Sequence, residues 1–271
     1  MQGCHGQQGS QETGRRKGPA TRMMLRMMGQ VKQKLWGLGG VHHLLGATED
    51  EARMPLPGDD LVASPQLQTT HAIDVDARAE AIWPWLVQIG QGRAGFYSDS
   101  PLWDACVDLY YRVLSHEQGA KGVRYQHDDA CIAPDWQDLR AGDVIPDGPP
   151  GTAFYVVREM VANHALVLFT TTHLPYMVPR ALRGSVAGEL SDAFVLLPLR
   201  TGATRVLRRM RVACRPLAFQ VFALPIVATW GEMITARRFL RGLKRRVESC
   251  EDAARKRRGT SHTSAQHLKP C

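Results

Sequence analysis

The stretch Ala81–Ser98, AIWPWLVQIGQGRAGFYS, decides between two fold classes. It contains Gly90-x-Gly92-x-x-Gly95, which is the glycine spacing of a dinucleotide-binding fingerprint. In that fingerprint the glycines follow a strand and open a helix, so that the N-terminus of the helix faces the pyrophosphate. The surroundings of these glycines therefore decide whether the stretch can bind a nucleotide.

Here the glycines follow a helix instead of a strand. The residues before them repeat at i, i+3, i+4 and i+7, which predicts one buried helical face formed by Ile82, Trp85, Leu86 and Ile89. Pro84 lies inside this helix and predicts a kink or a break. Gly90 is expected to end the helix and to begin a loop that leads to Phe96 and Tyr97. We therefore expect no nucleotide at this site.

The elements on either side indicate an α+β fold. Strand Thr69–Val75 comes before this helix, and a second helix is expected over residues 101–115. Thr48 and Glu51 have the spacing of a capping box for a short early helix. A long helix ends the pattern, with one apolar face formed by Met233, Ala236, Leu240, Leu243 and Val247. Between them, turn signals separate strands that we expect at 143–146, 152–161, 164–172, 191–199 and 203–213.

Composition favours a soluble cytoplasmic protein. Hydrophobic residues make up 44% of the 271 residues, and the six cysteines are scattered without a Cys-x-x-Cys pair. The basic N-terminal region lacks an apolar stretch long enough for a secretory signal. The most apolar run, Leu217–Trp230, is shorter than the ~20 residues that a membrane span needs.

The net charge of +8 comes from the two ends of the chain. Residues 1–46 carry +6 and residues 236–271 carry +8, which leaves −6 for residues 47–235. We expect a basic, disordered or weakly helical extension over 1–46, a folded domain over 47–250 and a basic disordered tail over 251–271. The basic ends suit weak contact with an anionic membrane, or simple solvation, and no specific nucleic-acid partner is expected.

Five segments resemble one superfamily. They are LPGDDLV (56–62), WPWLVQIGQGRAGFYS (83–98), APDWQDLRAGDVI (133–145), TRVLRRMRV (204–212) and RRFLRGLKRRVE (237–248). Over about residues 45–250 the chain resembles an uncharacterised bacterial subgroup of the Bet v 1/START-like superfamily, also called SRPBCC or polyketide cyclase-like. The subgroup often has a Trp where this chain has Asp192, and an apolar residue at Arg208.

The resemblance implies a helix-grip fold. In this fold a curved antiparallel sheet wraps a long C-terminal helix, with two short helices after the first strand. It also implies a cavity between sheet and helix for a sterol, lipid, polyketide or other hydrophobic small molecule, in keeping with the apolar character of ligand pockets.

Alternation along strand 203–213 predicts which side chains face the cavity. Val206, Arg208, Met210 and Val212 share one face. The other face carries Arg205, Leu207, Arg209 and Arg211, and its three arginines favour solvent. If the hairpin turns at Gly202, Arg208 lies opposite Leu196, and Asp192 is ~13 Å along the strand, too far for a direct pair. Arg208 would then meet an acidic group of the ligand, or extend to the cavity rim.

The complete set of residues expected to contact the ligand combines this strand with aromatic and final-helix positions. Tyr97 and Trp136 are included because they lie in loops, where binding residues concentrate. Aromatic side chains of this kind also commonly form core. The set is Tyr97, Trp136, Tyr155, Phe194, Val206, Arg208, Met210, Met233 and Leu240.

Catalytic residues cannot be assigned from the sequence. His71, His164 and His173 are isolated, and His173 suits either a general base or a satisfied structural histidine, because no partner acid is evident. His42, His43, His116 and His127 lack the ligand spacing of a metal site. There is no Walker loop and no Gly-x-Ser-x-Gly, so no metal and no cofactor is expected.

Three functions are compatible with these features. The first is binding of a hydrophobic small molecule. The second is a cyclase/dehydratase-type enzyme that uses the same cavity. The third is an interaction module that binds an anionic membrane or RNA through the basic ends. An enzyme should have an acid and a base within hydrogen-bond reach in the cavity, whereas a carrier should not.

Overall fold

A computed structural model describes residues 41–98, 105, 109, 131–220 and 231–265. The chain divides into two compact units, Met1–Gly39 and Gly40–Cys271, and all the described residues belong to the second unit. Most of the helix predicted over 101–115, His116, His127 and residues 1–40 lie outside them, as does most of the apolar run Leu217–Trp230.

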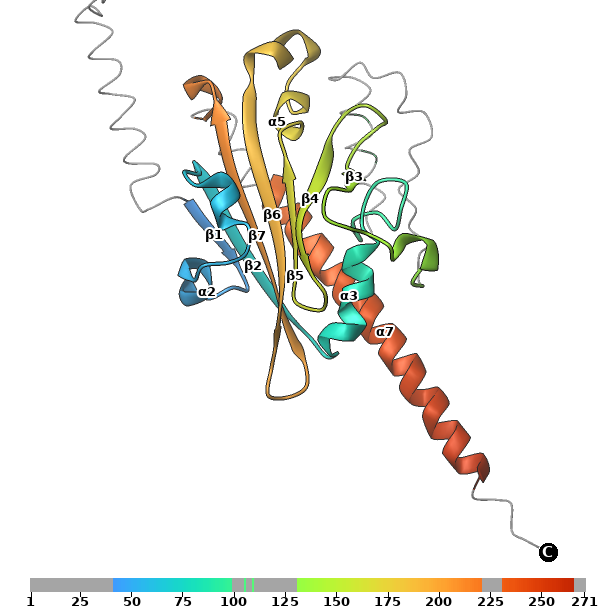
Figure 1. The fold of residues 1–271 in the computed structure, drawn as a ribbon. Helices are drawn as coiled ribbons and strands as arrows, with labels where there is room; N and C mark the ends of the chain where they lie inside the picture. Colours follow the sequence, from blue (N-terminus) through green and yellow to red (C-terminus); the bar gives the residue numbers. More distant parts are fainter. Residues whose placement is uncertain (1–40, 99–104, 106–108, 110–130, 221–230, 266–271) are drawn as a thin grey trace, which may run out of the picture. The chain divides into compact units, whose positions relative to one another are not determined.

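The second unit contains one curved sheet and one long helix (Figure 1). The strand order is β1-β2-β7-β6-β5-β4-β3, antiparallel throughout except for β1, which pairs parallel with β2. The strands are β1 (Val41–Leu45), β2 (Leu67–Val75), β3 (Val144–Pro146), β4 (Phe154–Val161), β5 (Ala165–Thr170), β6 (Ala187–Pro198) and β7 (Thr204–Arg215).

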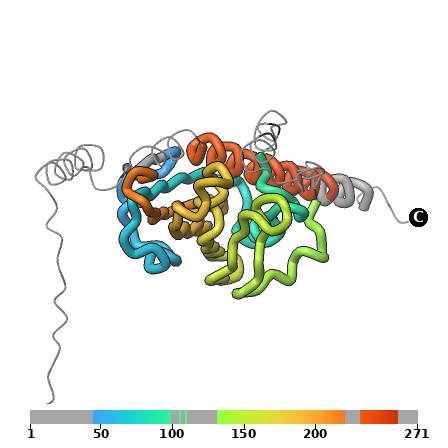
Figure 2. The backbone as a smooth tube through the Cα atoms, turned by 90° about the horizontal axis from the view of Figure 1, so that it is seen from above, coloured from blue at the N-terminus to red at the C-terminus, as the bar shows by residue number. Residues whose placement is uncertain are grey.

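Helices complete the pattern expected for a helix-grip fold. Helix α7 (Met233–Ala265) runs along one face of the sheet (Figure 2). The shorter helices are α2 (Glu49–Arg53), η1 (Asp59–Val62), α3 (Ala79–Val87), η3 (Pro134–Trp136), α5 (His173–Tyr176) and η4 (Arg180–Ser185). The predicted α+β, helix-grip architecture is confirmed.

The structure moves both predicted ends of the folded domain. Strand β1 lies within residues 41–45, which we had placed in the N-terminal extension, and it pairs with β2 from Val41↔Leu67 to Leu45↔His71. Helix α7 continues to Ala265, well into the tail predicted over 251–271. Both differences have the same cause. The predicted bounds were set by the basic composition of the ends, but an edge strand and a solvated helix can both carry polar residues.

The opening stretch forms a helix and a tight loop, as predicted. Helix α3 ends at Val87 and continues through Pro84, so of the two predicted outcomes the break is wrong and the kink stays a prediction. Gly90 and Gly95 exchange backbone hydrogen bonds of 3.1 and 3.0 Å, which closes the loop on itself. The backbone amides of Gly90, Gln91, Arg93, Ala94 and Gly95 all donate to carbonyl groups of the protein, so they do not offer a pyrophosphate a set of free donors.

Tyr97 anchors this loop between α3 and α7. Its hydroxyl donates to the Trp85 carbonyl at 2.6 Å, and its ring packs 5.8 Å from the ring of Phe239. Helix α7 approaches so closely that a Cβ atom on Gly242 would lie 1.9 Å from the carbonyl oxygen of Tyr97. A glycine at this position therefore sets the distance between α7 and the loop.

The inner face of the sheet packs against the apolar stripe of α7. On the helix, Ala236, Leu240, Leu243 and Val247 are buried, as predicted, and Phe239 joins them. The strands contribute buried side chains that alternate along each strand: Ile145, Val157, Leu166, Leu168, Leu196, Val206 and Val212. This layer is the core that positions the candidate site.

The outer face of the sheet is also covered, which the sequence did not predict. Leu207 is fully buried and Arg209 is only 2% exposed. The segment from α2 to η1 lies over them, and Leu56 packs with Leu207 and Val195 in a second apolar cluster. The expectation that this face of β7 meets solvent is therefore wrong.

The outer arginines of β7 hold this segment in place. Arg205 pairs with Glu51 at 2.8 Å, and this hydrogen bond lowers the pKa of the Glu51 carboxyl to about 2 against the effect of its partial burial. Glu51 also completes the predicted capping box with Thr48. Asp59 bridges Arg209 and Arg211, at 2.8 and 3.1 Å. Buried arginines are tolerated here because acids and carbonyl groups surround them.

Arg209 makes the largest number of these contacts. Its guanidinium donates to the Met54, Glu51 and Ala52 carbonyls, to Asp59 and to Thr70, at 2.7–3.2 Å. The sequence does not predict this role, because most of the partners belong to the α2–η1 segment, about 150 positions before Arg209.

We predict that Arg209→Ala lowers the free energy of unfolding by about 3–5 kcal/mol, because it removes a buried cation that pairs with Asp59 and leaves the Met54 and Glu51 carbonyls without this donor. Urea unfolding of the full chain measures the change. Arg200→Ala, at an exposed turn position, is the matched control and should change stability by less than about 0.5 kcal/mol. A loss at Arg209 as small as that of the control would show that the outer cover contributes little.

Candidate functional site

Five polar side chains meet in the middle of the apolar inner face. They come from β2, β6, β7 and the π-helical residues directly before α7, and all are buried. We name them the inner-face cluster: Thr69, His71, Asp192, Arg208 and Glu232. A buried polar group is costly without partners, so the contacts within the cluster determine what it can do.

The cluster is built around the ion pair of Arg208 with Asp192. Nε of Arg208 lies 3.0 and 3.1 Å from the two oxygens of Asp192, and Nη2 lies 2.7 Å from Oδ2. The guanidinium also lies 5.7 Å from the ring centroid of Phe194 and 5.8 Å from that of Phe239. The forked contact with Asp192, together with the two neighbouring aromatic rings, fixes the orientation of the guanidinium.

This pair corrects our expectation about strand register. Arg208 lies opposite Phe194, two residues from the predicted Leu196, because the hairpin pairs Pro198 with Thr204. Asp192 therefore lies diagonally across from Arg208 on the same face, within reach of its long side chain. The prediction that the two are too far apart is wrong, and Arg208, 7% exposed, does not extend to a solvent-exposed rim.

Glu232 connects this pair to His71. One carboxylate oxygen, Oε1, lies 3.5 Å from Nη1 of Arg208 and accepts from Thr69 at 3.3 Å. The other, Oε2, lies 3.4 Å from Nε2 of His71. Within the described part of the chain, four buried atoms of the cluster have no hydrogen-bond partner: Nδ1 and Nε2 of His71, Nη1 of Arg208 and Oε2 of Glu232.

The electrostatics of the cluster favour ionised acids. Burial raises the pKa of Glu232, but Arg208, His71 and Thr69 outweigh it and bring the pKa below its ordinary value. Burial alone would lower the pKa of Arg208, and Asp192 and Glu232 together raise it. Burial raises the pKa of Asp192 while Arg208 opposes that rise, and the three short contacts with the guanidinium favour the carboxylate form.

A second polar group lies at the end of the sheet where β3, β4 and β5 meet α5. Nε2 of His173 contacts Oδ2 of Asp147 at 2.7 Å, and Nδ1 contacts the hydroxyl of Thr170 at 2.9 Å. We name His173 and Asp147 the His173 dyad. The expectation that His173 lacks a partner acid is therefore wrong, and an acid and a base do lie within hydrogen-bond reach.

Tyr155 lies between the two groups. Its ring centroid is 4.3 Å from that of His173. Burial, followed by Asp147 and Asp192, raises the pKa of its hydroxyl well above 10, although Arg208 opposes this. The phenol consequently stays protonated at neutral pH and can donate a hydrogen bond.

The predicted ligand-contacting residues do not all lie together. Tyr155, Phe194, Val206, Arg208, Met210 and Leu240 are buried on the inner face or on the facing side of α7, and Met233 is partly buried beside Glu232. Tyr97 packs between α3 and α7, and Trp136 lies partly exposed in η3, where its carbonyl accepts from Arg93 at 2.9 Å. Tyr97 is thus held by contacts with Trp85 of α3, and Trp136 by Arg93 in the loop that follows α3.

Sequence reasoning did not assign Glu232, His71, Thr69 or Asp147 to the site. A signal existed for the first two. Glu232 lies four positions before Ala236, so it continues the buried stripe of α7, and His71 alternates with Thr69 and Ile73 toward the inner face. Asp147 gave no such signal, because its proximity to His173 depends on the pairing of β3, β4 and β5.

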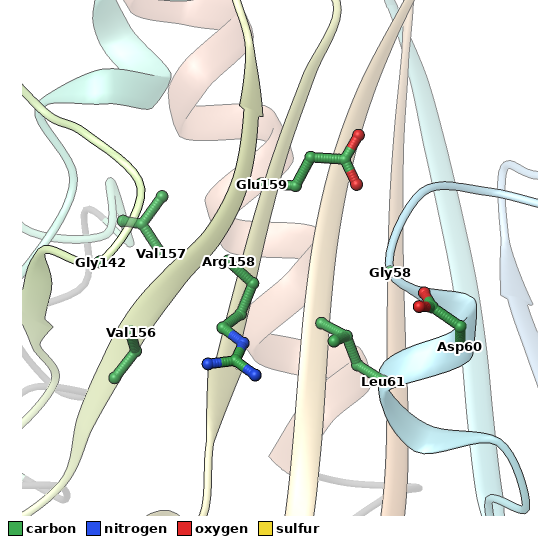
Figure 3. Close-up of a pocket in the computed structure, with 8 residues that line it drawn as sticks. All are labelled: Gly58, Asp60, Leu61, Gly142, Val156, Val157, Arg158 and Glu159. Atoms are coloured by element: carbon green, nitrogen blue, oxygen red, sulfur yellow. The ribbon is translucent and has the colours of Figure 1, made fainter.

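A pocket of about 390 Å³ lies elsewhere, between η1 and β4 (Figure 3). Its walls include three charged side chains and contain none of the predicted ligand-contacting residues; they are formed by Gly58, Asp60, Leu61, Gly142, Val156, Val157, Arg158 and Glu159. The predicted cavity between sheet and α7 is a separate place and stays a prediction.

Two further searches cover the described residues alone. Among them, no three His, Cys, Asp or Glu side chains are arranged to hold a metal ion. No described helix combines the length and the apolar character that crossing a membrane requires.

Comparison with known proteins adds no family assignment. No family model matches the sequence, and no curated protein matches it. Solved structures that align include a Mesorhizobium loti protein (12% identity, TM-score 0.36, 67% of this chain and 97% of the other). They also include a hypothetical protein of Helicobacter pylori (10%, 0.38, 73% and 97%) and an aromatase/cyclase from Streptomyces sp. R1128 (12%, 0.28, 66% and 94%).

These similarities are too distant to support an argument about function. The fold assignment rests on this chain's own strand order and on α7, which are consistent with a Bet v 1-like (SRPBCC) fold.

We predict that Arg208→Leu lowers the free energy of unfolding by about 3–5 kcal/mol, because it leaves two buried carboxylates without their cation. The double variant Asp192→Leu/Arg208→Leu should lose less than the sum of the two single variants, by about 2 kcal/mol. A double-mutant cycle in urea measures this coupling. The exposed pair Arg255–Asp76, 3.5 Å apart, is the control and should show coupling below about 1 kcal/mol. Additive losses at Asp192 and Arg208 would contradict the pairing.

Proposed function

We propose that the protein binds a small, largely hydrophobic molecule between the inner face of the sheet and α7. The side chains around the cluster supply an apolar surface, including Phe194, Val206, Met210, Phe239 and Leu240. Ligand sites in proteins combine such a surface with a few placed polar groups that orient the ligand. The inner-face cluster is suited to that second role.

One observation carries the proposal: four buried polar atoms of three neighbouring side chains make no hydrogen bond to the described residues. Three of them have only a long ion-pair contact, at 3.4 Å between His71 and Glu232 and at 3.5 Å between Arg208 and Glu232. Native interiors pair almost all such atoms, and each unpaired one costs about 1–3 kcal/mol. A ligand that brings a polar group to His71, Glu232 and Arg208 offsets this cost. An apolar core without a ligand would have no need of the cluster.

The His173 dyad favours a second candidate function, an enzyme of the cyclase/dehydratase type. A histidine that contacts a carboxylate through one ring nitrogen is held in a fixed orientation and tautomer. Asp147 would orient His173, which would move the proton, and Tyr155, kept protonated by its surroundings, would donate a hydrogen bond to the substrate. The buried Thr170 hydroxyl at Nδ1 lies where a proton could enter or leave the ring.

Contact of the basic ends with an anionic membrane or RNA is a further proposal. Most of the residues concerned, in 1–40 and 258–271, lie outside those whose side chains the structure describes. Nothing in the inner-face cluster depends on it.

We predict that the full chain binds the neutral dye Nile red saturably at one site, because the inner face offers an apolar surface. Fluorescence titration measures this binding, and native mass spectrometry of the protein as purified detects a bound molecule directly. Met210→Trp, which adds bulk beside Asp192, should abolish dye binding. Val144→Trp, on the exposed outer side of β3, is the matched control and should bind normally. A protein with neither a bound molecule nor a saturable dye site would contradict the proposal.

If the second candidate is right, the bound molecule identified by mass spectrometry, or its precursor, is converted by the wild-type protein in vitro. His173→Gln should then reduce the rate of conversion by about 100-fold or more without weakening binding more than a few-fold, because the dyad moves a proton. Binding without any conversion, in both wild type and variant, would leave the protein as a carrier.

A further inference from the structure

The hydrogen-bonding capacities of two atoms in the inner-face cluster indicate what kind of polar group the ligand carries. This inference rests on the proposed function and makes it more specific. Nη1 of Arg208 and Oε2 of Glu232 are buried and make no hydrogen bond to the described residues. Nη1 lies 3.5 Å from Oε1 of Glu232, the other oxygen of the same carboxylate. The two atoms are therefore close enough together for one small group to reach both.

Each of these two atoms has a fixed requirement. Arginine is always protonated in proteins, so Nη1 of Arg208 donates and needs an acceptor. Burial raises the pKa of Glu232, but its surroundings, with Arg208 foremost, bring the pKa below its ordinary value. Oε2 of Glu232 consequently belongs to a carboxylate, which only accepts, and it needs a donor.

The protonation state of His71 does not change these requirements. A neutral histidine has one N–H and a protonated histidine has two, so at least one N–H is present in either state. Neither ring nitrogen of His71 makes a hydrogen bond to the described residues, and the 3.4 Å contact of Nε2 with Oε2 of Glu232 is an ion-pair distance only. His71 thus adds a donor to the cluster and leaves Oε2 of Glu232 without one.

A ligand group with only one capacity leaves one of the two atoms unpaired. A ketone, an ether or a carboxylate accepts but does not donate, so Oε2 of Glu232 stays without a donor. This excludes the acidic group that we first expected at Arg208. An ammonium group donates but does not accept, so Nη1 of Arg208 stays without an acceptor. A hydroxyl or a carboxamide does both.

We infer that the inner-face cluster binds an uncharged group that both donates and accepts hydrogen bonds, a hydroxyl or a carboxamide, on a ligand that is otherwise apolar. The oxygen of this group accepts from Nη1 of Arg208, and its O–H or N–H donates to Oε2 of Glu232. Asp192 engages Nε and Nη2 of Arg208, which leaves Nη1 for the ligand. The apolar part packs on Phe194 and Phe239. Ordered water has the same two capacities and is the competing occupant.

Two matched pairs of compounds test this, titrated calorimetrically into the full chain at pH 7.5. Octanol and heptyl methyl ether are isomers, and octanamide has an amino group where heptyl methyl ketone has a methyl group. The ether and the ketone accept but do not donate. We expect octanol to bind at least five-fold more tightly than the ether, and octanamide at least five-fold more tightly than the ketone, because a buried polar group left unpaired rejects the analogue.

Apolar burial alone would give the opposite order, because the ether and the ketone are the less polar members of their pairs. Octylamine tests the second requirement, since its ammonium group donates but does not accept. We expect it to bind at least five-fold more weakly than octanol.

Glu232→Gln should reduce the ratio of octanol to ether affinity by at least three-fold. The side-chain amide of glutamine can donate as well as accept, so the variant no longer requires a donor from the ligand. Asp252→Asn is the matched control, because it makes the same change in net charge at an exposed position of α7, and it should leave the ratio unchanged. If Glu232→Gln fails to fold, the order of affinities in the wild type still decides the inference.

Equal affinities within both pairs, or tighter binding of the ether and the ketone, would overturn the inference and leave the proposed function standing, with water as the occupant of the cluster. Tighter binding of octylamine than of octanol would overturn it as well. A preference in one pair alone supports the inference and identifies which of the two groups binds. Failure of every compound to bind would overturn the proposed function itself, and the inference with it.

Discussion

The contact of Arg208 with Asp192 and Glu232 connects the three parts of the candidate site. Arg208 comes from β7, Asp192 from β6 and Glu232 from the π-helical residues directly before α7, so the guanidinium joins the sheet to the start of the long helix. Such a buried pair gives little net stability compared with apolar packing. Its presence in the centre of an apolar layer is therefore better explained by what it binds than by what it stabilises.

Strand β7 uses arginine in two different ways. On its outer face, Arg205, Arg209 and Arg211 are paired with acids and carbonyl groups of the α2–η1 segment and fix a cover over the sheet. On its inner face, Arg208 leaves Nη1 without a hydrogen-bond partner among the described residues. Arginine thus holds the α2–η1 segment on the outer face of β7 and belongs to the inner-face cluster on the other face. Satisfaction of donors does not by itself separate the two roles, because Nε of Arg211 also lacks a hydrogen-bond partner among the described residues; the partners on the two faces differ instead.

Asp192 and Arg208, two of the positions at which the chain departs from the subgroup it resembles, contact each other. Asp192 stands where a Trp is common, and Arg208 stands where an apolar residue is common. Each change alone would bury a charge without a partner, whereas both together form an ion pair. The polar character of the inner face is accordingly a property of this chain that the resemblance does not imply.

Much of the architecture follows from the sequence, because each element has a local signal. The apolar stripe of α7, the capping box at Thr48 and the loop after α3 depend on residues a few positions apart. The site is different. A shift of two residues in the β6–β7 register moved Asp192 from ~13 Å away to direct contact with Arg208.

Burial of the outer arginines and the proximity of His173 to Asp147 likewise depend on segments distant in sequence. The α2–η1 segment contacts β7 across about 150 positions, and Asp147 and His173 are 26 apart. Local patterns carry no information about such distances, so the acids that determine the chemistry of the site were missed or left unpaired.

The central claim is that the inner-face cluster is completed by a bound molecule. A crystal structure of the full chain as purified, at a resolution that shows ordered water, tests it most directly. The account predicts electron density that begins between His71, Glu232 and Nη1 of Arg208 and continues along Phe194 and Phe239 as one connected non-protein molecule. Protein side chains that fill this space completely, or that supply partners to all four atoms, would contradict it.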